Sequence, residues 1–86
     1  MLKIQRSTIG EVEFKLSGRM EAEHVPELSN LLASEKDALL VLDLTDLRLV
    51  DAEVVAFLLG SESKGVKLKN CPAYIREWIT SLRHEK

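Results

Sequence analysis

The sequence predicts an α/β fold with a mixed four-stranded sheet, and its hydrophobic periodicity carries the prediction. Apolar residues alternate at every second position in residues 2–16, as in half-buried strands. They recur every three or four positions in later segments, as in helices that pack by one face. A continuous apolar run, residues 38–42, is typical of a central strand covered on both faces. The predicted order is strand, strand, helix, strand, helix, strand, helix, written β-β-α-β-α-β-α.

The first two strands are expected to pair as an antiparallel hairpin. The alternating apolar residues are Leu2, Ile4, Val12, Phe14 and Leu16. Gly10 lies between the two segments, where a turn can use its freedom at positive φ. The hairpin is predicted to end at Ser17-Gly18.

The first helix is predicted over residues 25–32, with Pro26 in its first turn. Its apolar face consists of Val25, Leu28, Leu31 and Leu32. After the apolar strand, residues 43–48 are interrupted by polar side chains and are predicted to form a loop.

The second helix is predicted to open at Asp51, whose carboxylate can accept a hydrogen bond from a free backbone N–H. Its buried stripe is Val54, Val55, Leu58 and Leu59, and the segment 60–65 is expected to end it. A short strand is expected at Val66 and Leu68, reaching at most Asn70. The last helix starts at Cys71-Pro72, and its stripe, at i, i+3, i+4 and i+7, is Ile75, Trp78, Ile79 and Leu82.

Composition limits the classes of protein that this chain can represent. Its 86 residues allow one domain, 1–86, and a net charge of −2 with interspersed signs offers no basic field for nucleic acid. No apolar stretch approaches the roughly 20 residues that cross a bilayer, so no direct membrane insertion is expected. Because the single cysteine, Cys71, cannot form an internal disulfide, the cytoplasm is the expected location.

The order of elements and several local segments resemble the STAS domain, a family that includes anti-sigma factor antagonists and parts of sulphate transporters. Residues 14–21 look like the family's second strand and following loop. Residues 25–28 look like the start of its first helix. The closest piece, residues 40–47, is similar to the family's buried strand and the turn after it. The resemblance covers about residues 12–79.

The junction before the second helix departs from the family pattern. Phosphorylatable anti-sigma factor antagonists carry Asp-Ser-Ser-Gly there, and a partner kinase modifies the second serine. This chain has Asp51-Ala52-Glu53-Val54, so the resemblance implies that the phosphorylation switch is lost. Two interpretations of Glu53 stay open: a permanent, partial mimic of the modified serine, or a residue that merely suits a helix N-terminus.

The resemblance implies a surface that binds a protein partner and no catalytic residue, metal or cofactor. The expected partner-binding residues are Asp51, Ala52, Glu53, Arg19, Glu21, Thr45 and Asp46. Asp51 and Glu53, at i and i+2 of a helix, point in different directions and are not expected to form a catalytic pair. His24 and His84 are interpreted as solvated, and Cys71 as a small packing residue.

Three functions compete at this point. The first is a protein-interaction module that resembles an anti-sigma factor antagonist and regulates a partner by binding. The second is a STAS-like accessory subunit of a transporter or larger assembly. The third is a small ligand-binding protein or minor enzyme that uses Asp51, Glu53 and His24, which would need a concave pocket at the end of the sheet where the helices start. The oligomeric state and the partner are left open.

Overall fold

The protein is described by a computed structural model that covers residues 2–9, 11–35 and 39–84, without the side chain of Ile9. One four-stranded sheet has the order β1-β2-β3-β4. Strands β1 (Leu2–Ile9) and β2 (Glu11–Met20) are antiparallel, whereas β3 (Leu40–Val50) runs parallel to β2 and to β4 (Lys67–Lys69). The predicted α/β class, mixed sheet and order of elements are confirmed. The turn predicted at Gly10, and Ala38 in the apolar run, lie outside the described residues.

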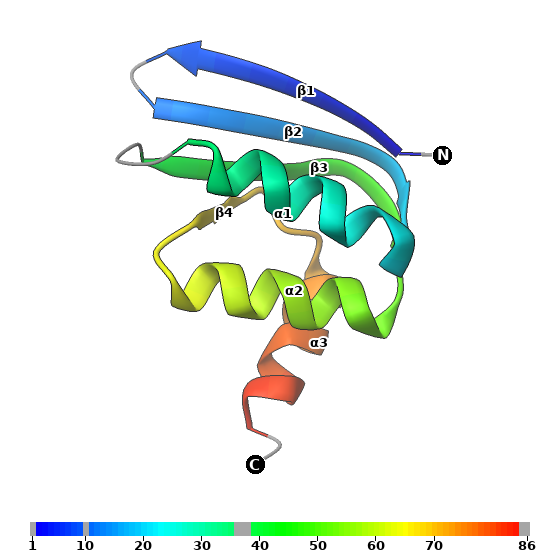
Figure 1. Cartoon of the computed structure of the whole chain (residues 1–86). Coiled ribbons are helices and arrows are strands. Elements are labelled where there is room, and N and C mark those ends of the chain that lie inside the picture. The colour runs from blue at the N-terminus through cyan, green and yellow to red at the C-terminus, as the bar shows by residue number, and fades with distance from the viewer. Residues whose placement is uncertain (1, 10, 36–38, 85–86) are drawn as a thin grey trace.

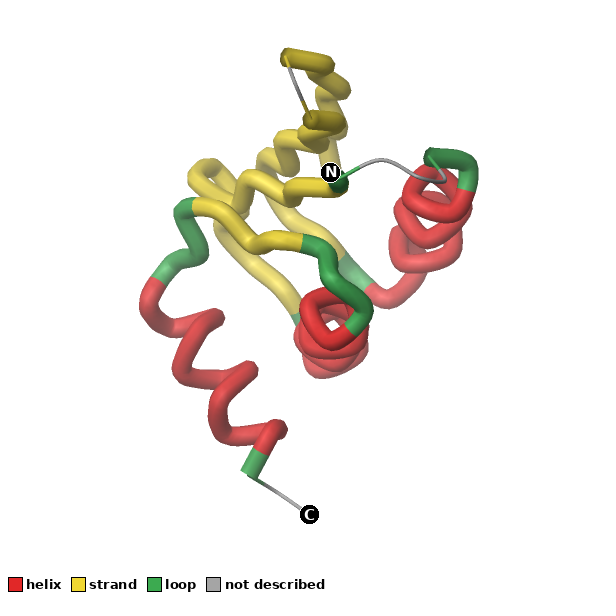
Figure 2. The backbone as a smooth tube through the Cα atoms, turned by 90° about the vertical axis from the view of Figure 1, so that its left-hand side faces the viewer, coloured by secondary structure: helices red, strands yellow, loops and turns green. Residues whose placement is uncertain are grey.

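The helices are arranged unevenly around the sheet. Figures 1 and 2 show α1 (Val25–Ala33) and α2 (Ala52–Ser63) on one side, while α3 (Ala73–Arg83) lies beyond the β4 edge and packs against α2. Within the described residues, no helix covers the other face of the sheet. The core therefore lies between the sheet, α1, α2 and α3. Its largest fully buried side chains include Phe14, Leu16, Met20, Leu28, Leu42, Leu44, Leu58, Ile75 and Ile79.

Strand β3 is longer than predicted, because it continues through the segment 43–48 that the sequence indicated as a loop. The pairing with β2 shifts register twice, and each shift places an extra residue in β3. At the first shift, the Asp43 carboxylate accepts bonds from the Thr45 backbone N–H (2.9 Å) and hydroxyl (2.6 Å). Burial raises the pKa of Asp43, but the bonds from Thr45, with smaller contributions from Asn70 and Lys69, outweigh it and lower the pKa. A polar residue here stabilises a bulge in the strand. The start of the strand also differs from the prediction. Leu39 was expected within the buried strand, but it is exposed and precedes β3.

Strand β2 also extends beyond its predicted end at Ser17-Gly18, up to Met20. Gly18 has φ of 95°, a conformation that residues with a Cβ adopt at a cost. It lies at the second register shift, so glycine allows the strand to bend instead of ending it. This bend carries the chain from β2 into the short helix η1 (Ala22–His24) and then α1.

The predicted end of α2 is too early, because the helix contains Gly60 and runs to Ser63. Val54, Val55 and Leu58 are buried as expected, whereas Leu59 is half-buried. A Cβ built at Gly60 meets no atom within 4 Å, so the glycine serves no close packing contact. The turn after the helix depends instead on Gly65, at φ of 102°.

Helix α3 is held on α2 by apolar packing and by one ionic cluster. Ile75 and Ile79 are fully buried, as expected. Trp78 was expected in the core, but it is partly exposed and packs at the edge of the core. Glu62 of α2 accepts two bonds from Arg76, both at 3.1 Å, and one from Arg83 at 2.8 Å. These bonds lower the pKa of Glu62.

We predict that Gly60→Ala stabilises the protein by about 0.5–1 kcal/mol, because alanine loses less backbone entropy than glycine in a helix and the site is open. Gly65→Ala is the matched control, and it should destabilise because its φ is positive. Urea denaturation of both variants and the parent measures the two effects. A loss of stability in Gly60→Ala would contradict the open environment assigned to this position.

Candidate functional site

The Asp51 carboxylate joins two segments that are far apart in the sequence. Its Oδ1 accepts the Val54 N–H at 3.0 Å and so caps α2, as predicted. Its Oδ2 accepts the Ala22 N–H, at the start of η1, at 2.8 Å. These two bonds, from Val54 and then Ala22, hold the pKa of Asp51 below its ordinary value of 3.8. Asp51 therefore fixes how the chain leaving β2 lies against the first turn of α2.

Glu21 and His24 organise the other half of this junction. The Glu21 N–H donates to His24 Nδ1 at 2.9 Å, and the His24 N–H donates to the Glu21 carbonyl at 2.8 Å. His24 was interpreted as solvated, but its ring is half-buried and closes this short helix. The histidine is thus a local structural partner of Glu21.

Ala52 and Glu53 are both exposed in the first turn of α2. Both oxygens of the neighbouring Asp51 carboxylate accept backbone N–H bonds, so the two acids do not form a shared site. This arrangement can present charge and shape to a partner, and it leaves Asp51 poorly suited to move a proton.

Two exposed apolar side chains and an exposed arginine lie at the same end of the sheet. Leu49 of β3 is 55% exposed and pairs across the strands with exposed Arg19 of β2. The Tyr74 hydroxyl, at the start of α3, donates to the Arg48 carbonyl, so the partly exposed Tyr74 ring is tied to the same strand end. We call Arg19, Leu49, Ala52, Glu53 and Tyr74 together the strand-end surface. Arg19 and Leu49 lie on the face of the sheet away from the helices, because the neighbouring Met20 is fully buried on the helix side. Leu49 and Tyr74 were missed as candidates because a strand end was not expected at residue 49.

Thr45 and Asp46, although predicted in the same surface, lie further back in β3. Thr45 donates to Asp43 in the bulge, and Asp46 forms an ion pair with Lys15 at 3.3 Å. Asp46 precedes Asp51 by five residues, about 16 Å along a strand that rises about 3.3 Å per residue. The structure therefore separates these two residues from Asp51, and they serve the bulge and a surface ion pair.

Cys71 is partly buried before α3, and its pKa is raised mainly by burial. A helix N-terminus lowers the pKa of an exposed thiol, but here the effect of burial is larger, so the thiol is kept protonated and fits the expected packing role. His84 is exposed at the end of α3. Among the residues that the structure describes, no group of three His, Cys, Asp or Glu side chains could hold a metal ion. In the same part of the chain, no helix combines the length and apolarity that a bilayer span requires.

Comparison with known proteins adds no identification. No protein-family model matches the chain, and no curated protein matches it. The resemblance to the STAS domain is therefore carried by the sequence segments and the order of elements alone.

We predict that Asp51→Asn weakens the fold above about pH 5, because an amide keeps one acceptor oxygen and turns a donor toward one of the two N–H groups. The carboxylate has a lowered pKa in the folded state, so its contribution is present above the unfolded value near 3.8. That contribution is lost as the pH falls through the lower folded value. Thermal melts between pH 3 and 7 should show a midpoint gap between parent and variant that narrows below pH 4.

Asp46→Asn is the control, since Asp46 is exposed and makes only a surface ion pair. A gap that stays constant down to pH 3 in Asp51→Asn would contradict the role given to the ionised carboxylate.

Proposed function

We propose that this chain is a protein-interaction module without catalytic activity, which acts on a partner protein by binding through the strand-end surface. The observation that carries the proposal is the combination of two exposed apolar side chains, Leu49 and Tyr74, with exposed Arg19 on a rigid strand end. Aromatic residues and arginine are enriched in protein interfaces compared with the rest of a protein surface.

The Asp51 bonds support the same proposal. A binding surface gains affinity when its backbone is fixed before the partner arrives, because less entropy is lost on association. Asp51 fixes both the exit from β2 and the first turn of α2, which carry Arg19 and Glu53 on either side. In this proposal Asp51 holds the backbone in place, and exposed Glu53 presents its charge to the partner.

The resemblance to anti-sigma factor antagonists indicates the kind of partner. A regulatory protein such as an anti-sigma factor, in the cytoplasm, fits the order of elements and the placement of residues 51–54 before α2. Since neither serine of the family pattern is present, the proposed module binds its partner without that phosphorylation switch.

The proposal is tested by photo-crosslinking in the native cell. A photoreactive amino acid in place of Ala52 should give a crosslinked partner, whereas the same group at exposed Lys67 of β4 should not. With the identified partner purified, Leu49→Glu should weaken binding more than tenfold in calorimetry, because it places a charge within an apolar contact. Lys67→Glu is the matched control and should leave affinity unchanged. Equal crosslinking at both positions, or unchanged affinity in Leu49→Glu, would place the interface elsewhere.

Glu53 receives a separate test with the same partner. Glu53→Gln removes the charge and keeps the shape, while Glu53→Ser restores the residue of the family pattern. If Glu53 mimics a modified serine, both variants should change affinity by more than tenfold while stability moves by less than about 1 kcal/mol. Unchanged affinity in both would leave Glu53 as a residue that suits a helix start.

A further inference from the structure

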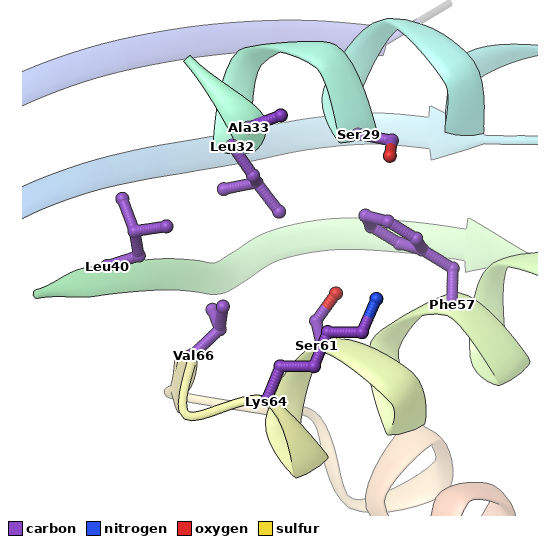
Figure 3. A pocket seen from close by; sticks show the side chains of 8 residues that line it. All are labelled: Ser29, Leu32, Ala33, Leu40, Phe57, Ser61, Lys64 and Val66. Carbon is purple, nitrogen blue, oxygen red and sulfur yellow. The ribbon is translucent and has the colours of Figure 1, made fainter. Parts of the chain in front are cut away.

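A groove of about 260 Å³ lies between α1 and α2, at the opposite end of α2 from Asp51. Ser61 follows Asp51 by ten residues, about 15 Å along a helix that rises 1.5 Å per residue. The apolar walls come from three elements and the turn after α2: Leu32, Leu40, Phe57 and Val66 (Figure 3). The groove is thus separate from the strand-end surface.

Ser61 is the unusual residue of this groove. The residue is only 7% exposed, but no buried side-chain N or O atom among the described residues lacks a hydrogen-bond partner, so the hydroxyl oxygen of Ser61 itself reaches the open space of the groove. The nearby Ser63 hydroxyl donates to the Leu59 carbonyl at 3.0 Å, as serines in helices often do. In Figure 3 the Ser61 hydroxyl points from α2 into the groove. A polar group of a ligand would take the place of water on this hydroxyl.

Two further polar groups point toward the same space. Figure 3 shows the Ser29 hydroxyl directed from α1 toward α2, and the Lys64 ammonium beside Ser61. Lys64 forms no ion pair with the residues that the structure describes. In Figure 3 the Phe57 ring lies between Ser29 and the other two groups, so the Ser61 hydroxyl and the Lys64 ammonium form the polar end of the apolar space, which suits one anionic head with an apolar tail.

The charge and size of the groove limit the ligand. The C-terminal end of a helix carries about −0.5 of a charge, but the last carbonyls of α2 already accept bonds from the turn that follows. The full charge of Lys64, an exposed side chain, therefore outweighs that end and favours an anion. A volume of about 260 Å³ is below the range of about 300–1,000 Å³ for drug-sized ligands, so the ligand is short.

We propose that the groove between α1 and α2 binds a small monocarboxylate with an apolar tail of roughly six to eight carbons. The tail packs between Leu32, Leu40 and Phe57. The carboxylate is held by the Lys64 ammonium and by the Ser61 hydroxyl. This inference does not depend on the proposed protein-binding function, because the two sites use opposite ends of α2.

Titration of ¹⁵N-labelled protein with sodium octanoate, followed by NMR, tests the proposal. Saturable shifts should concentrate at amides of the groove, with Phe57 and Ser61 among them. Lys64→Gln should weaken octanoate binding about tenfold, because a charge-assisted bond is lost, and should change the weaker binding of octan-1-ol less than twofold. Ser61→Leu, which fills the space with an apolar side chain, should abolish the binding of both compounds.

Lys67→Gln is the matched control, an exposed lysine of β4 that does not line the groove. It should leave octanoate affinity unchanged. Shifts that do not saturate, or an equal loss in Lys64→Gln and Lys67→Gln, would overturn the site. Octanol binding as tight as octanoate, with no effect of Lys64→Gln, would overturn the carboxylate.

Discussion

The Asp51 carboxylate accepts one backbone N–H from each of two segments, and the geometry of the strand-end surface depends on this pair of bonds. The Val54 bond starts α2, and the Ala22 bond holds η1 beside it. Without the second bond, the chain leaving β2 would be positioned by the burial of Met20, by the packing of Val25 on the core and by the local bonds between Glu21 and His24. Because a charged acceptor makes a stronger bond than a neutral one, a single side chain can order both segments.

This constraint explains why an acid at the junction does not indicate catalysis. A carboxylate that both caps a helix and holds a second N–H is stabilised in its charged form, as its lowered pKa reflects. General acid–base work needs a group that exchanges protons near neutral pH. The groove at the far end of α2 differs, because its walls are mostly apolar and the Ser61 hydroxyl reaches its open space. The strand-end surface therefore lies at the start of α2, and the groove lies at its other end.

Much of the fold follows from local patterns, and the exceptions have physical causes. The stripe of α3 and the cap at Asp51 were predictable, since each depends on neighbours within one or two turns. The length of β3 was not, because the polar side chain of Asp43 bonds within the bulge and makes a strand segment resemble a loop. Two glycines were wrongly expected to end an element. Gly18 lies within a strand, which it bends, and Gly60 lies within a helix.

The candidate site was predictable only in part, because its second half comes from long-range contacts. Asp51, Ala52, Glu53, Arg19 and Glu21 do lie where β2 and β3 end. The bond from Ala22 spans 29 residues, and that from Tyr74 spans 26, so no sequence period signals them. The groove likewise becomes visible only when α1 and α2 are placed side by side.

Amide hydrogen exchange measured by NMR tests the role of Asp51 most directly. The account predicts that the Ala22 and Val54 amides are both protected in the parent protein, and that both lose protection in Asp51→Ala while the amide of Leu42, in the central strand, keeps its own. An Ala22 amide that exchanges at the rate of an unprotected peptide in the parent would contradict the bond between the two segments. The strand-end surface would then lack the fixed backbone on which its proposed function rests.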